Sequence, residues 1–124
     1  MPNTATDKVV IIATHGPEDP ERATLPFVMG NAALVMDSEA VVILQATGVL
    51  LAKKGTYEHI FASGLPALHE LLTSFLESGG KLLVCTPCIQ DRKIDPSMLV
   101  DGAEPIAGAR VIKEVTESSA VLNY

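Results

Sequence analysis

Residues 82–88 read Leu82-Leu83-Val84-Cys85-Thr86-Pro87-Cys88 and combine a strand pattern with a pair of cysteines. The first three of these residues form a short apolar run, and the two cysteines come directly after it. Three more runs of this kind occur along the chain, at Val9–Ala13, Val41–Leu44 and Ala120–Leu122. None of them alternates polar with apolar residues. Each is therefore typical of a strand that is covered on both faces, as in a parallel sheet.

Helical patterns lie between these apolar runs. The segment Leu25–Met36 is apolar nearly all round, which predicts a helix that is buried on more than one side. We expect Thr24 to be its N-cap and Pro26 to lie in its first turn, where proline is tolerated. The short apolar segment Val49–Lys53 predicts one or two further helical turns after the second strand.

Two longer helices are expected in the second half of the chain. Leu65–Ser78 has apolar residues at 3–4 spacing, with Pro66 at its start and two glycines after its end. Ile106–Glu117 predicts another helix, with Ile112 and Val115 facing inward. The strands and helices thus alternate, which indicates an α/β fold with a mainly parallel sheet between helices.

The segment Cys88–Glu104 is the longest one without a clear element, and long irregular loops in compact domains are often functional. The whole chain has 124 residues, which is the length of one domain, so we assign residues 1–124 to a single domain.

Composition narrows the class of protein. Apolar residues make up 48% of the chain but aromatic residues only 4%, so Ala, Val, Ile and Leu must build the core. A chain of 13.1 kDa with a mean hydropathy of +0.31 has difficulty hiding so much apolar surface by itself. We therefore expect subunit contacts, and we expect the helix at Leu25–Met36 to contribute to them.

Charge and hydropathy also exclude several classes. The net charge is −6, and the nine Lys and Arg residues form no basic patch, which argues against direct binding of nucleic acid. The apolar segment Val41–Ala52 is too short to span a bilayer, and Met1–Lys8 shows no signal-peptide core. Two cysteines are too few for a disulfide scaffold. These observations predict a cytoplasmic protein that does not associate with membranes.

Three loops come directly after strands and therefore meet at one edge of a parallel sheet, where ligands bind in open α/β folds. They are Thr14–Pro17, Gln45–Gly48 and Cys85–Cys88. The pair Cys85-x-x-Cys88 has the spacing of a redox dithiol. Because Cys85 ends a strand before a helical turn, backbone N–H groups are expected to lower its thiol pKa.

Arg92 and Lys93 lie shortly after the cysteines, and a cation there favours a thiolate, a persulfide or a sulfur oxyanion. The alternative is that Cys85 is a small apolar residue at the end of a buried strand and Cys88 is incidental. Thr47-Gly48 before a short helix gives a weak signal for anion binding. No Rossmann or P-loop spacing is present, and we expect no cofactor.

A zinc site is a weaker hypothesis, because a single Cys-x-x-Cys supplies only two ligands. Neither of two further histidines is expected to supply a missing ligand, because His59 lies in a predicted loop and His69 on the solvated side of a predicted helix. His15 ends the first strand at the expected active edge, where it either assists a thiolate or substrate or simply closes the strand. We expect no metal.

The chain resembles the DsrE/DsrF-like family, and most closely its YchN-like branch, over almost its whole length. The segment Leu83–Ile94 is similar to the branch's strand, Cys-x-x-Cys and subsequent Arg-Gly-Ile, although Lys93 stands where the branch usually has glycine. The segment Leu99–Glu104 resembles its Asp-Gly-x-Glu segment. Thr14–Pro17 and Ser119–Leu122 are like the family's first loop and last strand.

This resemblance implies a three-layer α/β/α sandwich with a five-stranded sheet and a homo-oligomer, either a trimer or a hexamer. It also implies that Cys85 carries sulfane sulfur as a persulfide between sulfur donor and acceptor proteins, an activity of the sulfurtransferase type. In this hypothesis Cys88 is the resolving or partner thiol, Arg92 stabilises the anion, and His15, Thr47 and Gly48 contact the substrate.

Two other hypotheses come from different classes. The chain could be a non-enzymatic oligomeric module that binds a ligand or partner, with Cys85 and Cys88 structural or sensing redox state. A thioredoxin-like reductase fits less well, because that fold places its Cys-x-x-Cys after an early strand rather than a third one.

Overall fold

The four apolar runs all form strands in the computed structural model of the protein, which describes residues 6–124. They are β1 (Lys8–Ala13), β2 (Glu39–Leu44), β3 (Lys81–Cys85) and β5 (Ala120–Asn123). A fifth strand, β4 (Ala103–Ile106), completes a sheet with the order β4-β3-β2-β1-β5, and all neighbouring strands are parallel. The expected α/β fold with a five-stranded sheet is confirmed.

Both faces of the sheet are buried, which explains why its central strands do not alternate. Along β2, Val42 and Leu44 face one side while Val41 and Ile43 face the other. The parallel register pairs Val10 with Val41, and Ile43 with Leu83, so like-facing residues of neighbouring strands meet. Each face of the sheet thus has its own hydrophobic core.

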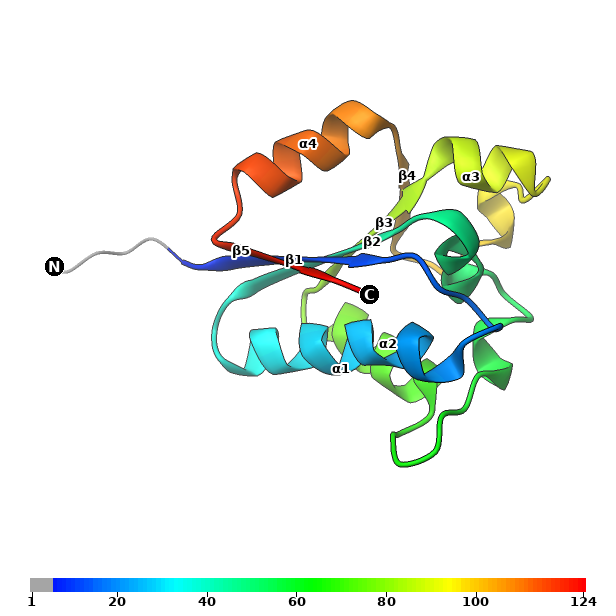
Figure 1. Ribbon diagram of the computed structural model, residues 1–124, viewed down its shortest axis with the longest axis horizontal. Coiled ribbons are helices and arrows are strands. Elements are labelled where there is room, and N and C mark those ends of the chain that lie inside the picture. Colours follow the sequence, from blue (N-terminus) through cyan, green and yellow to red (C-terminus); the bar gives the residue numbers. More distant parts are fainter. Residues whose placement is uncertain (1–5) are drawn as a thin grey trace, which may run out of the picture.

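Helices cover the two faces in three layers (Figure 1). Helices α1 (Pro20–Val35) and α2 (Leu68–Glu77) lie on one face, and α4 (Gly108–Thr116) lies on the other. Phe27 of α1 and Phe75 of α2 meet edge to face, with ring centroids 5.9 Å apart, between the sheet and the two helices. The short helix α3 (Thr86–Asp91) comes after β3 at the carboxyl edge of the sheet. The 3-10 helices η1 (Ala46–Ala52), η2 (Tyr57–His59) and η3 (Pro96–Met98) lie in the connections.

Helix α1 begins earlier than the sequence pattern predicts. Asp19, not Thr24, is the N-cap, and its carboxylate accepts from the Arg22 N–H. Thr24 is fully buried within the helix, where its hydroxyl donates to the Pro20 carbonyl at 2.7 Å. Pro26 therefore lies inside the helix rather than in its first turn. The sequence pattern missed the first turn of α1 because that turn is polar and exposed, and the prediction relied on apolar residues.

The other predicted helices are present with shifted ends. Pro66 precedes α2 instead of opening it, and Ile106 belongs to β4 instead of α4. The expectation that Ile112 faces inward is wrong: Ile112 is 62% exposed, and the neighbouring Val111 packs on the sheet instead. Val115 does face the sheet, as expected.

The segment Cys88–Glu104, expected to be irregular, contains most of α3, the whole of η3 and the start of β4. Strand β4 has no apolar run, because it is an edge strand in which Glu104 and Pro105 are exposed. Strand β5 is the other edge strand, and most of its residues are exposed rather than covered on both faces.

Helix α1 is not buried on several sides within the single chain. Met29 is 36% exposed and Val35 81% exposed, and Met36 just after the helix is 77% exposed. Of residues 6–124, no helix is long and apolar enough to cross a membrane. The expectation about Met1–Lys8 concerns a stretch whose first five residues lie outside the described part of the chain.

Candidate functional site

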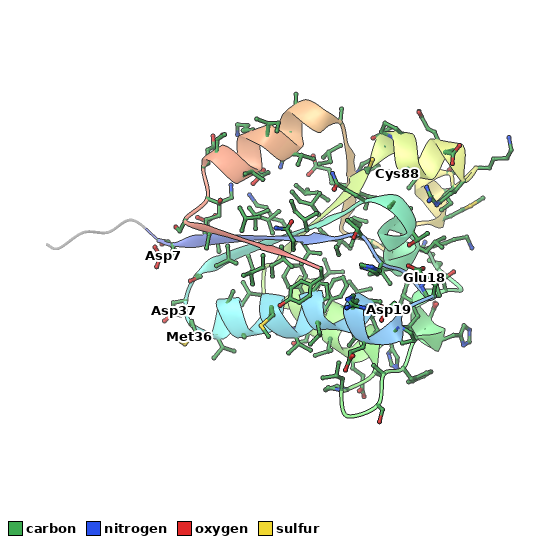
Figure 2. The ribbon with its side chains drawn as sticks, viewed as in Figure 1. Asp7, Glu18, Asp19, Met36, Asp37 and Cys88 are labelled. Atoms are coloured by element: carbon green, nitrogen blue, oxygen red, sulfur yellow. The ribbon has the colours of Figure 1, made fainter. Side chains whose placement is uncertain are left out.

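The two cysteines meet at the carboxyl edge of the sheet. Cys85 is the last residue of β3, and Cys88 lies in the first turn of α3 (Figure 2). Their sulfur atoms are 2.7 Å apart, both thiols are free, and both side chains are partly buried. The predicted dithiol is therefore assembled, with its two sulfurs in direct contact.

The pKa of the Cys85 thiol is raised, contrary to the expected lowering. Burial is the main cause, and the adjacent Cys88 thiol adds to it. The Cys88 backbone N–H and the positive charge of Arg92 act in the expected direction, but they are the weaker effects. The sequence shows the two favourable groups but not the burial at the base of α3 that outweighs them.

Arg92 lies beside the cysteines, as predicted. Its guanidinium donates to the Cys88 carbonyl at 3.1 Å, which fixes the cation at the end of α3. Lys93 comes next with φ = +55°, the left-handed conformation that glycine adopts most easily. The loop therefore keeps a glycine-like backbone although a lysine occupies the position.

The loop after β2 brings a third group to the sulfurs. Ala46 has φ = +52°, and its backbone N–H donates to the Cys88 sulfur at 3.3 Å. The Thr47 hydroxyl donates to a Glu18 oxygen at 2.7 Å and also contacts the Thr14 carbonyl at 3.3 Å. The Gly48 N–H donates to the Gln45 carbonyl. Thr47 and Gly48 are thus engaged within the protein, and it is Ala46 that touches the sulfur.

The loop after β1 is held by Glu18, which lies at the same edge of the sheet as Cys88 (Figure 2). Both Glu18 oxygens accept from the Gly16 N–H, at 3.0 and 3.1 Å. Burial tends to raise the Glu18 pKa, but the bonds from Gly16 and Thr47 lower it overall, with a smaller contribution from the His15 charge. Glu18 therefore remains a carboxylate that ties the first loop to the second.

His15, like Thr47 and Gly48, is a predicted site residue that forms no hydrogen bond with the sulfurs in residues 6–124. Its ring nitrogen Nδ1 lies 3.5 Å from the Thr14 hydroxyl, which itself donates to the Tyr124 carbonyl. Within residues 6–124, no hydrogen bond joins His15 to either cysteine. Over the same residues, no three His, Cys, Asp or Glu side chains gather as a possible metal site.

Two residues of the site, Ala46 and Glu18, were missed by the sequence reasoning. An alanine in the left-handed conformation has no sequence signature, because most such positions hold glycine or asparagine. Glu18 was missed because its contacts with the Gly16 N–H and the Thr47 hydroxyl form only when the two loops are folded against each other.

Comparison with known sequences gives a family and two relatives. The model of the DsrE/DsrF-like family matches residues 7–124. The uncharacterized protein MJ0760 of Methanocaldococcus jannaschii is 34% identical over 106 residues, which are 86% of this chain and 38% of that protein. The uncharacterized protein MJ0989 of the same organism is 31% identical over 117 residues, 94% of this chain and 99% of that one. The chain thus spans well under half of one relative and nearly all of the other.

Solved structures share the fold. The ychN protein from E. coli superposes with a TM-score of 0.75 at 16% identity, over 96% of this chain and 100% of that one. The protein MTH1491 from Methanobacterium thermoautotrophicum gives a TM-score of 0.69 at 13% identity, over 97% and 100% of the two chains. At these identities the likeness concerns the arrangement of strands and helices.

Proposed function

Because the chain belongs to the DsrE/DsrF-like family, we propose that it is a sulfur carrier, with Cys85 holding sulfane sulfur as a persulfide and Cys88 as its partner thiol. The observation that supports this proposal is the contact between the two sulfurs, 2.7 Å apart at the carboxyl edge of a parallel sheet.

The loading step is a thiol exchange. The Cys85 thiolate attacks the outer sulfur of a donor persulfide, R–S–SH. The bond between the two donor sulfurs breaks, R–S⁻ leaves, and Cys85–S–SH forms. Onward transfer is the same step in reverse, with the thiolate of an acceptor protein as the attacking group. The charge of Arg92, held at the end of α3, stabilises the anionic sulfur in both steps.

Mass spectrometry after incubation with polysulfide tests the proposal. We expect a mass increase of one sulfur atom on Cys85, and a longer-lived adduct in Cys88→Ser, where no partner thiol can attack it. Cys85→Ser should carry no adduct at that position. Absence of the adduct from both wild type and Cys88→Ser, with Cys85 reduced, would contradict sulfur carriage and favour a binding module whose cysteines are structural.

We further propose a homo-oligomer, a trimer or a hexamer, in which the exposed side of α1 is covered. The exposed apolar side chains Met29, Val35 and Met36 support this proposal, because a surface of this kind is typical of a subunit contact. Light scattering at micromolar concentration tests it, and a monomer alone would contradict it. The cytoplasm is the proposed location, since its reducing environment keeps a dithiol available for transfer.

A further inference from the structure

We propose that the Ala46 backbone amide is a working part of the sulfur site. It holds the Cys88 sulfur as an anion against Cys85, so that Cys88 attacks a persulfide on Cys85 and releases sulfide. The inference rests on the proposed function for the persulfide and for Cys88 as its partner thiol, and it names the group that makes the attack by Cys88 possible.

The Cys88 sulfur has a partner that does not come from its own helix. The Ala46 N–H belongs to the loop after β2, forty-two residues away in sequence, and donates to the sulfur at 3.3 Å. An N–H that donates to sulfur stabilises the thiolate more than the thiol, because the charged acceptor forms the stronger hydrogen bond. The Cys88 thiol donates to the Cys85 sulfur at 2.7 Å, so a Cys88 thiolate, once formed, is already in contact with its target.

The conformation of Ala46 is strained, which indicates that its direction matters. At φ = +52° the alanine lies in the left-handed region, which costs roughly 1–2 kcal/mol for a residue with a Cβ. Strain of this kind persists only where the surroundings enforce it, and it is concentrated at functional sites. Here the strain directs the amide at the sulfur.

The surroundings that enforce this conformation are visible on both sides of Ala46. On one side, the Gln45 N–H donates to the Ala13 carbonyl at 3.0 Å, which continues the sheet. On the other side, the Thr47 hydroxyl donates to Glu18, which is itself bound to the Gly16 N–H. The loops after β1 and β2 are therefore fastened together on both sides of the amide.

The two sulfurs have different surroundings, and the difference fits two roles. Burial and the neighbouring thiol raise the Cys85 pKa, whereas the Cys88 sulfur receives the Ala46 N–H. Once Cys85 carries a persulfide, the Cys88 thiolate attacks its inner sulfur. The bond between the two sulfurs of the persulfide breaks, HS⁻ leaves, and a Cys85–Cys88 disulfide forms. An external dithiol must then reduce that disulfide before the next turnover.

A single-atom change tests the role of the amide. Incorporating the α-hydroxy analogue of alanine at position 46 converts the amide to an ester and removes only the N–H. In the Cys85→Ser background, we expect alkylation of Cys88 by iodoacetamide at neutral pH to slow about tenfold, the effect of losing one hydrogen bond to an anion. The ultraviolet absorbance of the thiolate should fall in parallel.

The matched control is the same ester change at Lys53, at the other end of η1. The Lys53 N–H donates to the Leu50 carbonyl and does not contact a sulfur, so this ester weakens the loop without touching the site. We expect it to leave Cys88 alkylation and thiolate absorbance unchanged. Equal slowing by both esters would overturn the proposal, because loop stability would then explain the effect.

Release of sulfide gives an independent measurement in the chain with both cysteines. After loading with polysulfide, the Ala46 ester should release sulfide about tenfold more slowly than the Lys53 ester. Thr47→Val, which removes the bond to Glu18, should slow release in the same direction, and it provides the test if the Ala46 ester does not fold. Release at the wild-type rate in a folded variant that lacks the contact would overturn the inference. Failure to load Cys85 in Cys88→Ser would instead contradict the proposed function.

Discussion

Replacing Gly48 by alanine tests whether close packing of the loops after β1 and β2 holds the site together. A Cβ on Gly48 would overlap the Ala13 carbonyl oxygen and lie 3.0 Å from its carbon. Ordinary carbon–carbon contacts are roughly 3.5–4.0 Å, so the two backbones would have to separate by about 0.5–1 Å. Neither side has a flexible side chain that could move instead, because the obstructing atoms belong to the backbone of β1.

The expected loss of stability is about 2 kcal/mol, within the range for inserting a methyl group where there is no space. With a urea dependence of about 1–3 kcal/mol per molar for a small protein, the unfolding midpoint should fall by roughly 1 M. The same separation carries the Ala46 N–H away from Cys88, so Cys88 alkylation should slow even in the fraction that remains folded.

Gly108→Ala is the matched control, because nothing lies within 4 Å of a Cβ at the first residue of α4 and its φ is not positive. We expect its free energy of unfolding to equal that of wild type or to exceed it by up to about 0.5–1 kcal/mol, so its urea midpoint should not fall. Wild type and both variants should be compared at the same protein concentration, since association of subunits changes apparent stability. If Gly48→Ala and Gly108→Ala unfold at the same urea concentration, the packing argument is wrong.

Three further predictions concern other parts of the molecule. Glu114 is 3% exposed and contacts Lys8 and Arg110. Burial tends to raise the Glu114 pKa, but these two cations lower it overall. The stabilising effect of Glu114 is therefore present above its unfolded-state pKa and is lost as pH falls through its folded-state pKa. Glu114→Gln should therefore cost about 2–4 kcal/mol at pH 7, and calorimetry should show this difference shrink on acidification. Lys93→Gly should raise stability by about 0.5–1 kcal/mol, measured by urea unfolding, because it removes strain at a positive φ; an unchanged midpoint would argue against that strain. Val35→Glu should reduce the oligomer seen by light scattering without lowering the thermal midpoint of the monomer, whereas an unchanged mass would separate this side of α1 from the interface.

The sequence predicts the buried strands well and the edges of the fold poorly. β1, β2 and β3 are continuous apolar runs because both faces of the sheet are covered. Such a run can be recognised without knowing which strands or helices it packs against. β4 contains Glu104 and Pro105, which an edge strand tolerates, so only the family resemblance indicated a fifth strand. Burial therefore produced the signal of the three central strands, whereas the exposed edge strand β5 was found from its short apolar run at Ala120–Leu122.

Helix positions show a related limit. The inward face of α4 was placed on Ile112 instead of Val111, an error of one residue, which is about 100° around a helix. Apolar residues mark both positions, so composition could not choose between them. The buried Glu114 and its pairing with Lys8 fix the rotation of α4 against the sheet, and a glutamate in a helix is ordinarily assigned to solvent.

The site residues likewise fall into a group that the sequence predicts and a group that it does not. The cysteines and Arg92 were identified because their spacing along the chain is short, and local spacing fixes their geometry within one turn. Ala46 and Glu18 were not, because their contacts depend on how two crossover loops pack at the edge of the sheet. That packing also gives the two sulfurs different surroundings, since Cys85 is affected mainly by burial and Cys88 receives the Ala46 N–H.

The structure shows where the apolar side chains of this apolar-rich chain lie. Most of them lie in the two cores on either side of the sheet, which a three-layer domain covers by itself. The remainder includes Met29 and Val35 on α1, and Leu122 on the exposed edge strand β5. An unpaired edge strand and exposed apolar side chains both favour association with another chain. The sulfur site lies at the opposite end of α1 from Met36, near Glu18 and Cys88 (Figure 2), so covering the exposed end of α1 would leave the cysteines accessible to a sulfur donor.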